Sequence, residues 1–159
     1  MQQHLSAFVT LLAVVFPLHA FAQDHIEISG QTTLSMNGDV TLSIDEFEML
    51  APRTIFKTST PWHTPTLFSG ISGVDFISAT GAIGQMITVR AINDYQTRIP
   101  ISDLTDLGVL FVTRMNGKRL SLRQKGPLFV IYPFDQNPEL KTELYYGRSI
   151  WQVNKITVE

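Results

Sequence analysis

Residues 108–133 read GVLFVTRMNGKRLSLRQKGPLFVIYP and contain two uninterrupted apolar runs, Val109–Val112 and Leu128–Tyr132. Such runs are typical of strands that are covered on both faces, whereas a strand with one wet face alternates apolar and polar residues. The pair Asn116-Gly117, which follows the first run, is a strong signal for a tight turn. We therefore expect the two runs to be strands at the centre of a sheet.

Shorter segments on both sides of these runs predict further strands. In a half-buried strand every second residue is apolar, as it is in Ile26–Ser29. The last such segment changes phase between Val153 and Ile156, which predicts a bulge near Asn154-Lys155. The predicted strands are Ile26–Ser29, Val40–Ser43, Arg53–Thr60, Met86–Ile92, Thr97–Ile101 and Ile150–Val158, with Asn93-Asp94-Tyr95 as the turn between the fourth and the fifth.

Four short segments carry helix signals. Ser72 and Asp75 form a capping pair at the start of one helix, which would turn Val74 toward the core. Asp45 and Glu48 form the corresponding pair for another helix. The predicted helices are Asp45–Leu50, Ile71–Ala79, Ser102–Leu107 and Glu139–Tyr146. Because strands dominate and no regular βα repeat occurs, the predicted fold class is α+β, a mixed and mainly-β sheet with short helices.

The first residues have the pattern of a signal peptide. The apolar run Ala7–Leu18 is too short to span a bilayer as a helix, and Ala20-Phe21-Ala22 is a small-x-small cleavage pattern. We therefore expect residues 1–22 to be removed on export to the periplasm, which leaves one domain, residues 23–159, without a transmembrane segment. A buried N-terminal helix is the alternative, because no Lys or Arg precedes the run.

Composition and motifs exclude several classes of function. The formal net charge is −2 and the basic residues form no run, so nucleic acid is not an expected partner. The chain has no Cys, which excludes disulfides, thiolate metal sites and Cys nucleophiles, and only His25 and His63 remain after the leader. No phosphate-binding loop, dinucleotide fingerprint or zinc motif is present. We accordingly assign no catalytic residue and no metal ligand.

Aromatic residues are the more informative candidates for a site. Trp62 lies between Pro61 and Pro65, where a large ring either lines a ligand site or plugs the end of a strand. The stretch Tyr145–Trp151 combines three aromatic rings with Arg148 and Ser149, a set that suits a flat heteroaromatic ligand. Its alternative is a surface clamp in which the arginine stacks on a tyrosine. The basic residues between Lys118 and Lys125 are expected to be solvated.

From Ser29 onward the order of these segments resembles the sulfite-oxidase family of molybdopterin-binding domains, in particular its small exported members. The resemblance covers nearly the whole chain after the leader and is strongest in the second half. The segments that carry it are Asn93-Asp94-Tyr95, Ile99-Pro100, Arg114-Met115-Asn116-Gly117, Gly126-Pro127-Leu128, Tyr132-Pro133 and Arg148-Ser149-Ile150-Trp151-Gln152. The resemblance implies the sulfite-oxidase fold.

In catalytic members of that family a Cys thiolate ligates molybdenum, and alignment on Trp62 puts this position near Thr58. A hydroxyl is a far poorer ligand for this metal. The resemblance therefore implies a non-catalytic periplasmic sensor that binds a pterin and regulates an inner-membrane diguanylate cyclase/phosphodiesterase, and thus cyclic-di-GMP signalling. Two alternatives stay open, a molybdopterin-dependent oxidoreductase and a structural partner of a membrane protein that binds no small molecule.

The expected pterin site contains seven residues. Trp62 and Trp151 are expected to be its stacking walls. Asp94 and Arg148 would bond the edges of the ring, because a carboxylate facing the donor edge of a pterin can form paired hydrogen bonds. Tyr95, Tyr146 and Ser149 would complete the pocket.

Overall fold

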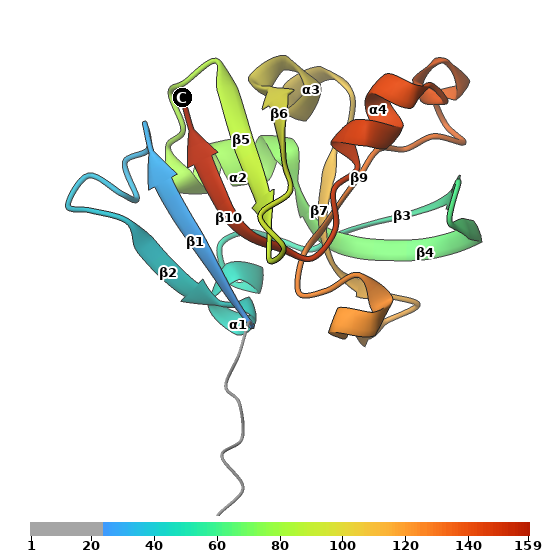
Figure 1. Ribbon diagram of the computed structural model, residues 1–159, viewed down its shortest axis with the longest axis horizontal. Helices are drawn as coiled ribbons and strands as arrows, with labels where there is room; N and C mark the ends of the chain where they lie inside the picture. The colour runs from blue at the N-terminus through green and yellow to red at the C-terminus, as the bar shows by residue number, and fades with distance from the viewer. Residues whose placement is uncertain (1–23) are drawn as a thin grey trace, which may run out of the picture.

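The computed structural model describes residues 24–159, so the predicted signal peptide lies outside the described residues. The described chain is mixed α+β and mostly sheet, with short helices around two five-stranded sheets (Figure 1). The sequence patterns predicted a single sheet, which is wrong. No helix within residues 24–159 is long and apolar enough to cross a membrane.

The first sheet has the strand order β2-β1-β10-β5-β6. Its strands are β1 (His25–Gly30), β2 (Val40–Ser43), β5 (Met86–Ala91), β6 (Gln96–Pro100) and β10 (Val153–Val158). β1 and β10 pair in parallel, and the other pairs of this sheet are antiparallel. The register between β10 and β5 shifts between Val153 and Lys155, which confirms the predicted bulge.

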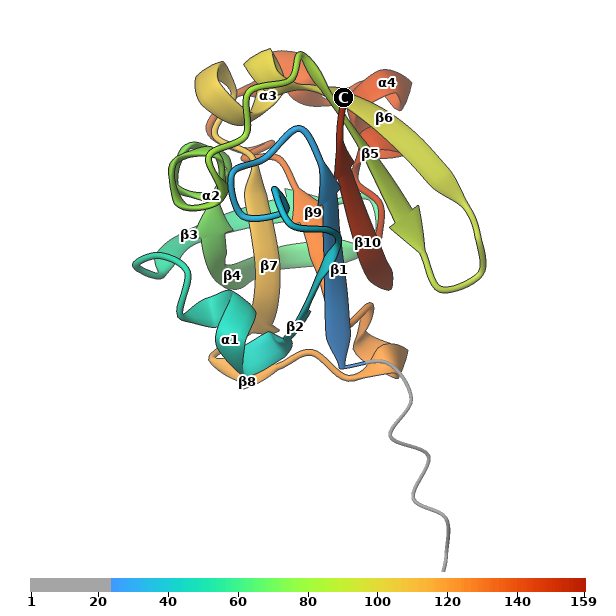
Figure 2. The ribbon, with the colours of Figure 1, turned by 90° about the vertical axis from the view of Figure 1, so that its left-hand side faces the viewer.

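The second sheet has the order β3-β4-β7-β8, and a fifth strand, β9, also pairs with β7. Its strands are β3 (Thr54–Thr60), β4 (His63–Ser72), β7 (Leu110–Met115), β8 (Lys118–Arg119) and β9 (Phe129–Ile131). In Figure 2, β1 lies right of centre, with β9 partly behind it and β7 beside it. Asn116 and Gly117 both have positive φ in the turn from β7 to β8, as predicted.

The two apolar runs are strands buried on both faces, as their sequence predicts. On β7, Phe111 joins the large core between the sheets, whereas Leu110 and Val112 join a second cluster on the opposite face. The placement of β9 differs from the prediction, because β9 pairs only with β7 and is not central. Its other edge meets the segment before β10, where Val130 N donates to Ile150 O (2.9 Å).

β4 is the element that sequence reasoning missed. No strand was predicted in the proline-flanked segment around Trp62, yet a ten-residue strand begins at His63 and contains Pro65. The register with β3 shifts between Thr58 and Thr60, at the end of the hairpin. Proline is tolerated at such irregular strand ends because no ladder hydrogen bond is required of it there.

The helices are α1 (Ile44–Glu48), α2 (Gly73–Thr80), α3 (Ile101–Asp106) and α4 (Glu143–Arg148). α2 has the predicted cap, in which Ser72 Oγ accepts from Asp75 N, although Val74 is exposed and not turned inward. The predicted cap of α1 is wrong. The capping box is formed by Ser43 and Glu46, and Asp45 lies inside the helix.

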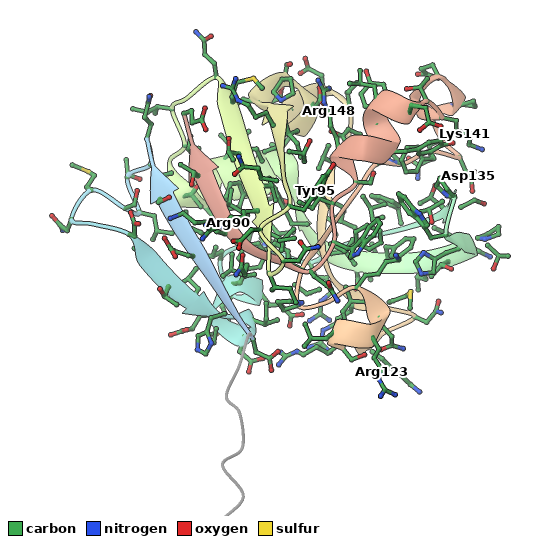
Figure 3. The ribbon with its side chains drawn as sticks, viewed as in Figure 1. Arg90, Tyr95, Arg123, Asp135, Lys141 and Arg148 are labelled. Atoms are coloured by element: carbon green, nitrogen blue, oxygen red, sulfur yellow. The ribbon has the colours of Figure 1, made fainter. Side chains whose placement is uncertain are left out.

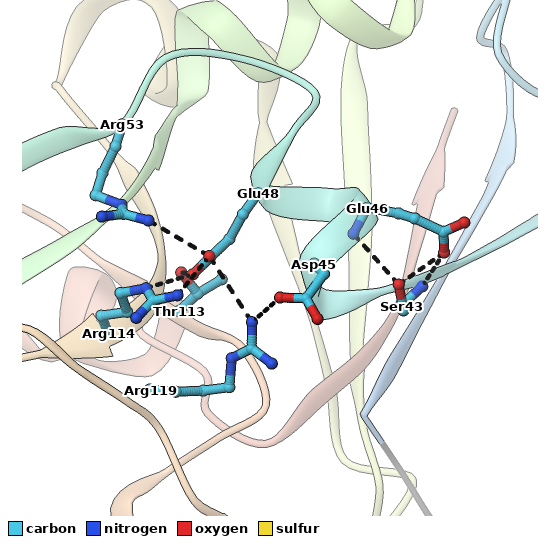
Figure 4. A network of polar contacts seen from close by, with 8 residues as sticks. All are labelled: Ser43, Asp45, Glu46, Glu48, Arg53, Thr113, Arg114 and Arg119. Atoms are coloured by element: carbon cyan, nitrogen blue, oxygen red, sulfur yellow. Dashed lines mark hydrogen bonds and ion pairs between the residues drawn. The ribbon is translucent and has the colours of Figure 1, made fainter.

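The last residue of α1, Glu48, ties the helix to the second sheet (Figure 4). Its carboxylate accepts hydrogen bonds from Arg114 Nε and Nη2 (both 2.9 Å) and from Thr113 Oγ1 (2.5 Å). Burial disfavours the charged form, but the hydrogen bonds from Arg114 and Thr113 outweigh it, so the pKa of Glu48 lies below its ordinary value. The Glu48 carboxylate, which was expected to cap the start of the helix, instead joins its end to β7.

Candidate functional site

A pocket of about 390 Å³ opens where the ends of the two sheets meet, and we call it the seam pocket. An isolated antiparallel bridge between Leu128, just before β9, and Val153, at the start of β10, connects the two sheets. The volume lies in the range of small-molecule sites. The lining residues are Trp62, Ala91, Asn93, Tyr95, Glu143, Tyr146, Gly147, Ser149, Ile150, Trp151 and Gln152.

Three parts of the chain that are distant in sequence supply this lining. Trp62 comes from the turn between β3 and β4, and Asn93 and Tyr95 come from the turn between β5 and β6. α4 supplies Glu143, Tyr146 and Gly147, and the segment from Ser149 to Gln152 leads from α4 into β10. Figure 3 shows Tyr95 at the front of the molecule, below α4. The site is therefore made mostly of turns that the sheets hold in place.

The aromatic rings form one continuous wall. Trp62 packs edge to face on Trp151, with ring centroids 5.0 Å apart, and on Tyr146 at 6.4 Å. No flat ligand fits between two rings in contact at 5.0 Å, so the expectation of two opposed tryptophan walls is corrected. Both tryptophans are about one-third exposed, 38% for Trp62 and 36% for Trp151, which leaves ring surface available for stacking.

A cation lies beside this wall. Lys125 Nζ is 3.8 Å from the centroid of the Trp151 ring and 5.2 Å from that of Trp62, which is cation–π geometry. Burial lowers the pKa of Lys125. Burial, followed by the charge of Lys125, also lowers the pKa of the nearby His63. Lys125 is therefore packed against the aromatic wall, in contrast to the solvated side chain that the sequence predicted.

The polar groups of the pocket come from its rim and floor. Glu143 is exposed and contributes the carboxylate of the lining. Ser149 is buried, and its Oγ donates to Tyr145 O (2.9 Å) while keeping its lone pairs for an incoming donor. Gln152 is committed elsewhere, because its Nε2 donates to Leu122 O (3.0 Å).

The structure brings together five of the seven residues expected at the site: Trp62, Tyr95, Tyr146, Ser149 and Trp151. Asp94 does not line the pocket; its side chain is 87% exposed and lies 3.8 Å from Arg90. Arg148 does not line it either, because its guanidinium points to Asp103, where Nη1 donates to Oδ2 (2.8 Å). The assignment of these two residues to the ring edges is thus corrected.

Sequence reasoning missed Glu143, Asn93 and Gly147 as lining residues. No role was predicted for Glu143 beyond its place in the helix Glu139–Tyr146. A usable signal was its spacing of three residues before Tyr146, which places the two side chains on one face of a helix. Gly147 lies beside them, and a Cβ added there would meet no atom within 4 Å.

The position implied for a molybdenum thiolate holds a structural hydroxyl. Thr58 is fully buried, and its Oγ1 accepts a hydrogen bond from Asp135 N (3.0 Å). Asp135 in turn accepts from Ser59 N (2.6 Å) and Lys141 Nζ (2.8 Å), and these hydrogen bonds lower the pKa of Asp135 to about 2. Figure 3 shows Asp135 and Lys141 at the same end of the molecule.

These residues do not fit a thiolate-bound molybdenum centre. The chain has no Cys, and the hydroxyl of Thr58 is already engaged. Within residues 24–159 no group of three His, Asp or Glu side chains is arranged to hold a metal ion. We therefore derive no chemistry from such a centre.

Comparison with known proteins supports the fold. No protein-family model and no curated protein matches the chain. Among solved structures it is similar to the crystal structure of the sulfane dehydrogenase SoxCD from Paracoccus pantotrophus, with a TM-score of 0.63 and 12% sequence identity. The match covers 84% of this chain but only 37% of that chain. It supports a distant fold relationship and is consistent with a sulfite-oxidase-like fold.

Proposed function

We propose that the protein binds a flat heteroaromatic ligand of the pterin class in the seam pocket, and that it acts by binding and not by catalysis. The observation that carries the proposal is the convergence of four aromatic side chains and one carboxylate on a single open pocket. Pockets for small ligands combine an apolar, aromatic lining with a few convergent polar groups.

The residues that line the pocket have different roles in this proposal. The continuous face of Trp62, Trp151 and Tyr146 offers a surface on which a bicyclic ring stacks. A pterin has adjacent N–H donors on its pyrimidine edge, and the carboxylate of Glu143 accepts paired hydrogen bonds from such an edge. Ser149 and Asn93 remain for the other polar atoms.

The cellular location and the regulatory partner are proposed from the sequence resemblance alone. We propose that the protein is exported to the periplasm after removal of residues 1–22. There it regulates an inner-membrane diguanylate cyclase/phosphodiesterase according to its pterin load. The rival function, a molybdopterin-dependent oxidoreductase, lacks support from the donor atoms around Thr58.

Calorimetric titration with pterin and with its tetrahydro form tests ligand binding. The chain has two tryptophans and both line the pocket, so tryptophan emission gives a second readout. Glu143→Gln should weaken binding about tenfold, because it removes charge-assisted hydrogen bonds. The matched variant Asp94→Asn removes a carboxylate outside the pocket and should bind as the wild type does.

Two outcomes would overturn the proposal. One is the absence of binding heat with either pterin. The other is stoichiometric molybdenum in protein purified from the periplasm, measured by elemental analysis.

A further inference from the structure

α4 presents two different faces. Glu143, Tyr146 and Gly147 line the seam pocket, whereas Tyr145 and Arg148 face the interior. The ring of Tyr145 packs on that of Tyr132, with centroids 5.2 Å apart. The helix is therefore both a wall of the pocket and a part docked on the core.

α4 has little stability of its own. It contains six residues, no side chain caps its N-terminus, and none of its residues is fully buried. Helices this short are unstable in isolation, so their position is set by tertiary contacts. The position of this pocket wall therefore depends on the few contacts that its inner face makes.

One of these contacts is a largely buried ion pair with α3. Arg148 Nη1 donates to Asp103 Oδ2 (2.8 Å), and Tyr132 Oη donates to the same oxygen (2.7 Å). Asp103 is 5% exposed and Tyr132 is fully buried. Removing Arg148 would leave a buried carboxylate with a tyrosine as its partner, which is costly. The pair thus favours one position of the helix over all others.

We infer that Arg148 is a positioning residue for the pocket. It acts through Asp103, holds Tyr146 and Ser149 in the wall, and makes no contact with the ligand. Its helical neighbour Tyr146 reaches Trp62, so a displaced α4 disturbs the stacking surface as well. This inference rests on the proposed ligand site, and it changes the role expected from the sequence, in which Arg148 bonded the ligand directly.

A double-mutant cycle separates positioning from direct contact. Arg148→Met, Asp103→Asn and the double variant are titrated with tetrahydropterin. If Arg148 acts through Asp103, each single change weakens binding about tenfold and the double change is no worse than either, because coupled residues are not additive. If the effect of Arg148→Met is as large in the Asp103→Asn background as in the wild type, the inference is wrong.

Two further variants complete the design. Arg148→Lys should restore most of the affinity, because one donor reaches Asp103 in the native pair. Arg98→Gln removes an arginine that is paired with Glu159, outside the pocket, and should leave affinity unchanged. Failure of the lysine variant to bind better than Arg148→Met would count against the positioning role.

A ligand-free readout distinguishes failure of the inference from failure of the proposed function. Quenching of tryptophan emission by iodide should increase in Arg148→Met and in Asp103→Asn, because Trp62 packs on α4. Circular dichroism verifies that the variants are folded. If the wild type binds no pterin but quenching increases in the two variants, the proposed ligand is wrong and the positioning role of Arg148 is supported. Unchanged quenching in folded variants would refute the positioning role of Arg148.

Discussion

The indole rings of Trp62 and Trp151 meet edge to face, with centroids 5.0 Å apart and planes inclined at 69°. This contact joins the hairpin of the second sheet to the segment that enters the last strand of the first sheet. Lys125 covers the Trp151 ring at 3.8 Å. The contact makes the two tryptophans one surface, and it is the reason that the pocket is a stacking face and not a slot.

Filling the pocket at Gly147 should block the ligand and spare the fold. A side chain at this position meets open space, and replacing glycine within a helix favours folding by about 0.5–1 kcal/mol. Gly147→Leu should therefore lose pterin binding in calorimetry without a lower unfolding midpoint. Thr105→Leu, which places the same side chain at an exposed position of α3, is the control. Wild-type affinity in Gly147→Leu would place the ligand elsewhere.

Glu48→Gln should cost about 2 kcal/mol of unfolding free energy, because it weakens the hydrogen bonds to Arg114 and Thr113 in a mostly buried setting. Glu159 also accepts from an arginine and a threonine, Arg98 and Thr88, but its side chain is 42% exposed. Glu159→Gln should cost less than Glu48→Gln, because solvent screens an exposed ion pair. Urea unfolding measures both, and equal losses would contradict the role given to burial.

Thr58→Val should destabilise the protein by about 1–3 kcal/mol, because Asp135 N would lose the buried hydroxyl that accepts its hydrogen bond. Thr58→Ser keeps the hydroxyl and should cost less. Thermal unfolding of the two variants gives the comparison. A valine variant as stable as the serine variant would show that the hydroxyl at this position has no structural task.

The protein should lose stability as the pH falls from about 7.5 to 5.5. Burial and the charge of Lys125 lower the pKa of His63 in the folded state, so the unfolded chain takes up a proton near pH 6.5 that the folded chain does not. The stabilisation is present above pH 6.5 and declines below it. In urea titrations at the two pH values, His63→Phe should remove the decline and His25→Gln should keep it.

Lys125→Met should raise the pKa of His63, because the variant removes a nearby positive charge and keeps the packing of the side chain. Desolvation still acts, so the pKa of His63 stays below its ordinary value. NMR titration of the imidazole measures the change. Lys57→Met, which removes an exposed lysine on β3, is the control, and an equal shift in both variants would contradict the proximity effect.

Local patterns were sufficient for most of the secondary structure. The alternation in Ile26–Ser29, the continuous runs in β7 and β9, and the phase change in β10 depend on neighbouring residues only, and the structure confirms all of them. β4 was missed because prolines near its start conceal a strand whose partners, β3 and β7, lie on either side of it. Pairing of this kind cannot be detected from a strand's own residues.

For the candidate site, too, the sequence determined one part and the tertiary structure the other. By itself the sequence determined that aromatic residues near Trp62 and in Tyr145–Trp151 were available for a ligand, and that no thiolate was available for a metal. Only the tertiary structure decided that Glu143 faces the pocket and that Arg148 turns to Asp103. The physical reason is that residue type sets which interactions a side chain can make, whereas the direction it faces is set by elements distant in the chain, here α3 and the meeting of two sheets.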